Sequence, residues 1–291
     1  MSEATGLKLI QEAQDNLKTA GLYLNTKQVE QHKSAAALMF LVREAVLEIF
    51  EESPKTRHTR PIYRSCLNDD SQNLSSATYN LLTHRDKSAL LDLMKRYQSI
   101  VSGMYAYLDG GGSLQVRDLE ELTKNWFIED VEMDRGEFRS EIVNLQVDID
   151  ALKKRLQWKE IIDTSESGEI DAHVLHAREI LASDIICMRE KLHRFFGVIH
   201  GEIDQEDDEE KCGIVWEFHT EMIEDYDSLG MIVAWIIDEW AIVEAIWMVE
   251  RLADFAKKMF TYLENGDVHI FSESCIAIQG CDPDKDAEDE G

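Results

Sequence analysis

Histidine and acidic residues with metal-ligand spacing are concentrated in one part of this chain of 291 residues. Five of the nine histidines lie between positions 173 and 219. Glu190 and His193 form an E-x-x-H pair, which places a carboxylate and an imidazole on one helix face, as in carboxylate-bridged metal bundles. Glu217 and Glu221 lie one helical turn apart and could supply facing carboxylates. No second E-x-x-H occurs, so a metal-binding helical bundle is our third hypothesis, and we predict no cofactor.

The longest apolar run extends from Gly230 to Val249 and contains only three charged residues, Asp238, Glu239 and Glu244. Its length would span a bilayer, but three carboxylates near its middle would be costly there. We therefore predict no membrane association and a buried helix at the centre of an all-α core. At least one of these carboxylates should be buried, and it must then be paired or protonated. Pairing with an arginine and service as a catalytic acid are the two alternatives.

One short motif points to a known family. Arg194-Phe-Phe-Gly-Val-Ile-His200 has R-x(4–6)-H spacing, and the alanine-rich stretch SAAALMFLVREAVLEIF lies in an N-terminal pair of predicted helices. In both respects the chain resembles the HEPN family of small helical ribonucleases. The resemblance implies RNA cleavage without metal, with Arg194 stabilising the phosphate and His200 acting as acid and base. Phe195 departs from the family pattern, which usually has a small polar residue there, and the ribonuclease is our alternative function.

The charge of the chain bears on its partners. The formal net charge is −28, from 58 acidic and 30 basic residues. Non-specific binding to nucleic acid requires a basic surface, so nucleic acid is an expected partner only under the ribonuclease alternative. A protein partner with a basic surface is favoured instead. Residues 202–210 hold seven acids, and in this acidic loop we predict partner contacts at Glu206, Asp207, Asp208 and Glu209.

The only basic cluster in the sequence lies in PKTRHTRPIYR. Its role could be to neutralise acidic surface of the same chain or to bind a phosphate-bearing ligand or an acidic partner segment. The residues we assign to partner binding here are Lys55, Arg57, Arg60 and Arg64.

The cysteines and the N-terminus indicate the compartment. Five widely spaced cysteines without a C-x-x-C pair imply neither a disulfide framework nor a zinc ribbon. The N-terminal residues MSEATGLKLIQEAQ do not have the pattern of a secretory signal. We therefore predict a cytoplasmic protein.

Hydrophobic periodicity predicts an all-α fold of eight or nine helices. Helices are expected over residues 7–20, 28–52, 86–108, 113–127, 134–156, 167–200, 213–226 and 228–264. Gly21 should end the first of them. Residues 54–76 should interrupt the helical pattern with a polar loop, LNDDSQNLSS. Near the C-terminus, VHIF and CIAI could form a small β-hairpin.

Two patterns concern organisation. Gly110, Gly111 and Gly112 stand together, and we predict that they separate an N-terminal unit, 1–109, from a bundle, 113–280, which a disordered acidic tail, 281–291, follows. Apolar residues at heptad spacing form a seam over 138–156, which suits either an internal antiparallel pair or a coiled coil in a homodimer. The residues of this seam are Phe138, Ile142, Leu145, Ile149, Leu152 and Leu156.

These patterns contain no convergent catalytic motif. Many helices and a strong charge contrast favour a non-catalytic protein-interaction or regulatory subunit in the cytoplasm, which binds its partner through helical and acidic surfaces.

Overall fold

The computed structural model describes residues 2–52, 60–110, 135–156, 171–204, 208–239 and 242–272. Within these ranges the chain is helical and contains no strand, which confirms the all-α fold class for this part of the protein. The α-helices are α1 (Glu3–Leu24), α2 (Val29–Glu52), α3 (Arg60–Tyr79), α4 (Ser88–Gly110), α6 (Arg135–Arg155), α8 (Ala172–Asp204), α9 (Glu209–Ala234) and α10 (Ile242–Asn265). Two π-helical turns, η2 (Asn80–His84) and η3 (Trp235–Glu239), and a 3-10 turn, η4 (Val268–Ser272), complete them.

The N-terminal hairpin forms as predicted, but its first helix is longer. α1 continues past Gly21 to Leu24. Asn25 is its C-cap, and the backbone N–H of Asn25 donates to the carbonyl of Leu22 at 3.2 Å. Leu24 is fully buried, so its packing in the core favours one more helical turn over a stop at Gly21. A Cβ at Gly21 would lie 3.6 Å from Met94 Sδ, so this glycine is a point of ordinary packing against α4.

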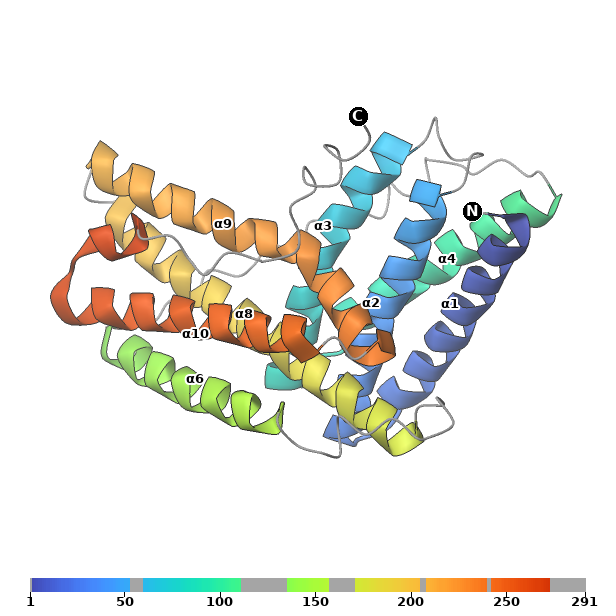
Figure 1. Ribbon diagram of the computed structural model, residues 1–291, viewed down its shortest axis with the longest axis horizontal. Helices are drawn as coiled ribbons and strands as arrows, with labels where there is room; N and C mark the ends of the chain where they lie inside the picture. The colour runs from blue at the N-terminus through green and yellow to red at the C-terminus, as the bar shows by residue number, and fades with distance from the viewer. Residues whose placement is uncertain are drawn as a thin grey trace.

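The centre of the molecule is α8. Its 33 residues make it the longest helix of the described part, and it contacts α2 and α3 as well as α6, α9 and α10 (Figure 1). α8 therefore links the N-terminal helices to the C-terminal ones, and a single hydrophobic core includes residues from both. The predicted domain boundary at 110–112 lies largely outside the described residues and stays a prediction.

The apolar run Gly230–Val249 is not the single central helix that we predicted. α9 continues without a break from residue 209 to Ala234, η3 follows to Glu239, and α10 starts at Ile242 and runs back in the opposite direction (Figure 1). Two helices can each turn a face to the core. Buried residues therefore occur in both parts of the run, whereas Val243 on α10 is 69% exposed.

The prediction of a polar loop is wrong, because LNDDSQNLSS is part of α3, and most of its described side chains are buried. Asp70 is 0% exposed, and its carboxylate is paired with Arg96 of α4 at 2.9 Å and accepts a hydrogen bond from Tyr97 at 3.2 Å. Polar residues can occupy a helix interior when partners from neighbouring helices satisfy them. The sequence of α3 lacks an apolar face because its buried face is partly polar.

The heptad seam of α6 is buried inside the chain, with each of its six apolar residues at most 1% exposed. α6 packs on α10 and α8. The seam therefore packs within the chain, which was one of the two alternatives for it, and its residues are not free to form a homodimer contact.

The predicted β-hairpin is not formed in the described residues. Residues 268–272, the first half of the predicted hairpin, make the 3-10 turn η4. The second half of the hairpin, 275–278, lies outside the described residues, as does the acidic tail. Phe271 is 3% exposed, and its ring centroid lies 5.3 Å from that of Phe196 and 4.9 Å from that of Phe218. A phenylalanine can pack among other aromatic rings without strand pairing. The Phe271 ring of VHIF is therefore accounted for by this aromatic cluster and does not require a β-hairpin.

Candidate functional site

The two residues of the ribonuclease hypothesis face different neighbours. Arg194 is 8% exposed, donates to Glu190 at 3.1 Å and lies over the ring of Tyr79 at 4.3 Å. The ring of His200 instead lies 5.4 Å from that of His219 on α9. Between them in the sequence, the apolar residues Phe195, Phe196 and Ile199 are buried in the core. Arg194 and His200 thus do not meet at one cleft.

The residues of the metal hypothesis are likewise engaged elsewhere. Glu190 accepts from Ser76 at 2.7 Å as well as from Arg194, and Glu221 is paired with Arg251 at 3.0 Å. His193 Nε2 lies 3.1 Å from His219 Nε2, and Glu217 is exposed. Among the described residues, no three histidine, cysteine, aspartate or glutamate side chains are arranged to hold a metal ion.

The His193–His219 pair is largely buried and lies near the guanidinium of Arg189. Burial and the nearby guanidinium of Arg189 lower the pKa of His193 to about 2, and burial also lowers the pKa of His219. Both imidazoles are therefore neutral at pH 7, and one nitrogen of the pair must donate to the other. Burial is the main cause that keeps both imidazoles uncharged.

Of the predicted partner-binding residues, half lie in the described helices. Lys55, Arg57, Glu206 and Asp207 lie outside the described residues, and Arg60 and Arg64 belong to the start of α3. Asp208 is the N-cap of α9, where its side chain accepts from the backbone N–H of Lys211 at 3.3 Å. Glu209 follows in the first turn and is exposed. Acidic residues at this position stabilise the helix, which gives part of the acidic loop a structural role.

The predicted arginine partner of the acidic residues in the apolar run can be tested only in part. The side chains of Asp238 and Glu239 are not among those that the structure describes, and Glu244 is half-buried. Arg178 of α8 is 0% exposed and donates to the carbonyl of Ile237 at 3.2 Å. A buried arginine therefore does lie against this run.

An acidic groove, which the sequence did not indicate, lies between α1, α2, α8 and the end of α9. Its volume is about 520 Å³. Its floor is apolar and consists of Leu9, Leu38, Leu41, Ala45, Leu175, Ala234 and Ile237. Its acidic residues are Glu12, Asp15, Glu44, Glu48 and Glu179, and no basic residue is among the described residues that line it.

The acidic residues of this groove differ in depth. Glu12, Asp15 and Glu48 are exposed at its rim. Glu179 is 5% exposed and lies 3.6 Å from His176, and Glu44 is half-buried and paired with Arg43. Burial raises the pKa of both Glu44 and Glu179 above the ordinary value. Their local partners therefore do not fully offset the cost of burying their charge, which leaves the groove receptive to a cation.

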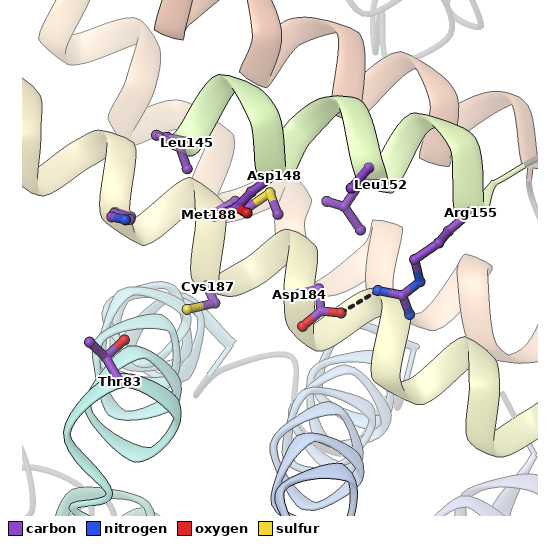
Figure 2. Close-up of a pocket in the computed structure, with 10 residues that line it drawn as sticks. Thr83, Leu145, Asp148, Leu152, Arg155, Asp184, Cys187 and Met188 are labelled. Atoms are coloured by element: carbon purple, nitrogen blue, oxygen red, sulfur yellow. Dashed lines mark hydrogen bonds and ion pairs between the residues drawn. The ribbon is translucent and has the colours of Figure 1, made fainter. Parts of the chain in front are cut away.

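A second cavity, of about 390 Å³, lies between α6, α8 and η2 (Figure 2). Leu145, Leu152 and Met188 give it an apolar wall, and Asp184 is joined to Arg155 at its edge. Cys187 and Thr83 line the opposite side. Burial raises the pKa of the Cys187 thiol to about 11, so this cysteine is a weak nucleophile at neutral pH.

Comparison with family models, with curated proteins and with solved structures found no match to this chain. In the described part, no helix is both long enough and apolar enough to cross a membrane.

Sequence analysis missed the acidic groove because its residues come from distant parts of the chain. One usable pattern was present in α2, where Glu44 and Glu48 stand one turn apart beside the apolar residues Leu41 and Ala45. Acidic residues next to apolar ones on a largely buried helix indicate the edge of a groove. Glu12 and Glu179, by contrast, join this edge only through tertiary packing.

Proposed function

We propose that this protein is an interaction or regulatory subunit that binds a basic segment of a partner protein in the acidic groove. The observation behind the proposal is the combination of five acidic residues with an apolar floor. The cations paired with two of these acids, Lys8 with Glu12 and Arg43 with Glu44, are not among the described residues that line the groove. Lysine and arginine side chains have apolar stems and charged ends, so they suit such a surface. Three rim carboxylates would speed encounter with a basic partner, and the apolar floor would supply most of the affinity.

The dimensions of the groove favour a helical segment. Residues 38–48 of α2 run along it, which corresponds to about 15 Å at 1.5 Å per residue. A helix of about ten residues covers the same length, and an amphipathic helix in an apolar groove is a common mode of recognition. η3 contributes Ile237 to the floor, and π-helical turns are frequent at functional sites.

A defined probe tests the proposal. The probe is a short fluorescent peptide with leucine and lysine at helical spacing, and binding is measured by anisotropy at low and high salt. The groove variant combines Asp15→Lys with Glu48→Lys at the exposed rim. The control combines Asp150→Lys with Glu250→Lys, which makes the same change in net charge at exposed positions that do not line the groove.

The groove variant should weaken peptide binding about tenfold, which corresponds to ~1.4 kcal/mol, and the control should change it much less. Capture from native lysate with the same proteins then identifies the natural partner, which should be retained by the control and lost by the groove variant. Equal weakening in both variants would overturn the proposal, because it would assign binding to overall charge. A third variant, Glu209→Lys with Glu210→Lys, tests the predicted contribution of the acidic loop.

A further inference from the structure

Beside the cavity between α6, α8 and η2, a lysine and an arginine share one carboxylate. Lys33 Nζ and Arg155 Nη1 are both paired with Asp184, the arginine at 2.5 Å. These three side chains are between 15% and 24% exposed, so water screens their charges only in part. This cluster of two cations and one carboxylate carries one net positive charge. Arg155 and Asp184 line the cavity, whereas Lys33 is not among the lining residues and contacts Asp184 from beside it.

The guanidinium of Arg155 retains donors for a further partner. An arginine has five N–H donors, and Asp184 is the one ion-pair partner of Arg155 among the described residues. Lys33 likewise has three donors, and its described ion-pair partner is the same carboxylate. A second carboxylate could therefore join this site without displacing Asp184.

The remainder of the cavity is suited to a hydrocarbon body. Leu145 and Leu152 are fully buried on the α6 side, and Met188 faces the same space from α8 (Figure 2). Lys191 lines the cavity too, but it is paired with Glu141 at 2.9 Å. The volume of about 390 Å³ lies in the lower part of the range of small-molecule pockets.

We propose that this cavity binds a small monocarboxylic acid with a hydrocarbon body. The carboxylate of the ligand would accept from Arg155 and Lys33 beside Asp184, and the hydrocarbon would contact Leu145, Leu152 and Met188. A single negative charge matches the local excess. A phosphate dianion would exceed it and would be repelled by Asp184 and by Asp148, which also lines the cavity. This site is separate from the acidic groove and does not depend on the proposed function.

Octanoate is a suitable probe, and its binding to the full-length protein can be measured by isothermal titration calorimetry. Acetate has the same charge without the chain, and 1-octanol has the chain without the charge. We expect octanoate to bind at least about tenfold more tightly than either, because it alone uses both ends of the cavity. If 1-octanol binds as well as octanoate, the cations have no role and the proposal is wrong.

Cys187 reports whether the probe occupies this cavity. Alkylation of individual cysteines by iodoacetamide can be followed by mass spectrometry at about pH 9, where more of this thiol, with its raised pKa, is ionised. Saturating octanoate should slow the alkylation of Cys187 severalfold. Cys212 on α9 does not line the cavity and serves as the internal control. If both cysteines react as before in the presence of bound octanoate, the ligand lies elsewhere and the proposed site is wrong.

Two substitutions should change octanoate affinity in opposite directions. Arg155→Gln removes a cation and should weaken binding about tenfold, whereas Asp184→Asn removes the competing carboxylate and should strengthen it. Arg139→Gln is the matched control, because Arg139 is an exposed arginine of the same helix, paired with Glu264 at 2.8 Å. Weakening by both cavity variants would overturn the proposal, since that is the result expected if the ion pair only maintains the structure. The protection of Cys187 in the unmodified protein provides a test that does not depend on folding of the variants.

Discussion

At the scale of single residues, buried arginines are the characteristic feature of this bundle. Among the side chains that the structure describes, six arginines are at most 8% exposed: Arg43, Arg96, Arg178, Arg189, Arg194 and Arg251. Some donate to backbone carbonyls, as Arg43 does to Leu67 at 2.8 Å, and others are paired with carboxylates, as Arg96 is with Asp70. Loss of one partner from such a pair typically costs ~3–5 kcal/mol, because it leaves a buried charge uncompensated. These polar contacts therefore restrict which helices can pack together.

The buried histidine on α8 predicts acid sensitivity. The pKa of His193 is lowered to about 2 from 6.5, so between these pH values the unfolded chain binds a proton there and the folded protein does not. Stability from His193 is complete above pH 6.5 and is lost as the pH falls, by up to about 1.4 kcal/mol per pH unit. Asp70 acts in the opposite sense: burial raises its pKa to about 6, so between pH 3.8 and 6 its protonation favours the folded state.

Comparison of the protein with a His193→Asn variant tests the contribution of His193 together with any change it causes in its partner His219. Denaturant unfolding at about pH 7, 6 and 5 should show a smaller loss of stability per pH unit in the variant, because its unfolded state no longer takes up that proton. The contribution of Asp70 is present in both proteins and cancels in the difference. An unchanged pH dependence would mean that a different group causes the acid sensitivity.

At the scale of the elements, the approach of α9 to α2 depends on one glycine. A Cβ at Gly230 would lie 2.7 Å from Arg43 Nη1 and would clash with the carboxylate of Glu44. Arg43 is 1% exposed and held by the carbonyl of Leu67, so it has little freedom to move away. Glu44 lines the acidic groove, which means that this contact also fixes one of the groove's acidic residues.

We expect Gly230→Ala to destabilise the protein, although alanine is the better helix former. Overpacking should cost ~1–3 kcal/mol and exceed the helix-propensity gain of up to ~1 kcal/mol. Gly213→Ala on the same helix is the matched control, since no atom lies within 4 Å of a Cβ there, and it should be neutral or stabilising. Chemical denaturation of both variants measures the difference. Equal stability of the two variants would show that the Arg43–Glu44 pair can move away at little cost.

At the scale of the whole molecule, the charge is unevenly distributed. The net charge is −28, yet the surroundings of the two cavities differ: all charged residues of the described lining of the acidic groove are acidic, whereas beside α6 two cations share one carboxylate. Each cavity includes a residue from a π-helical turn, Ile237 of η3 in the groove and Thr83 of η2 in the other. Both cavities thus adjoin a turn of irregular helical geometry. We propose a basic ligand for the acidic groove and a carboxylate for the cavity beside α6.

The net charge predicts that salt stabilises this protein. Raising the ionic strength from about 0.01 M to about 0.15 M shortens the Debye length from ~30 Å to ~8 Å and screens the repulsion among acidic residues. The midpoint of thermal unfolding should rise by a few degrees. The Asp150→Lys, Glu250→Lys variant has a net charge of −28 + 4 = −24 and should gain less. A midpoint that falls with added salt would show that surface ion pairs outweigh the repulsion.

The sequence by itself determined the fold class and most helix positions. The helices near 28–52, 86–108 and 134–156 are visible from periodicity alone, because each presents an apolar face of regular spacing. The burial of the seam from Phe138 to Leu156 follows from the same spacing. Local pattern is sufficient wherever a helix is buried against apolar neighbours, since the 3.6-residue period then appears directly in the sequence.

Only the tertiary structure decided the features that depend on partners distant in sequence. α3 resembles a loop because its buried positions include Asp70, whose partner Arg96 lies on another helix. The apolar run Gly230–Val249 gave no sign of its division between α9 and α10, because both of its parts face the core. The acidic groove and the Lys33–Asp184–Arg155 site each combine residues from three or more helices. Charge complementarity across helices leaves no periodic trace along the chain, so its partners are determined only when the helices pack.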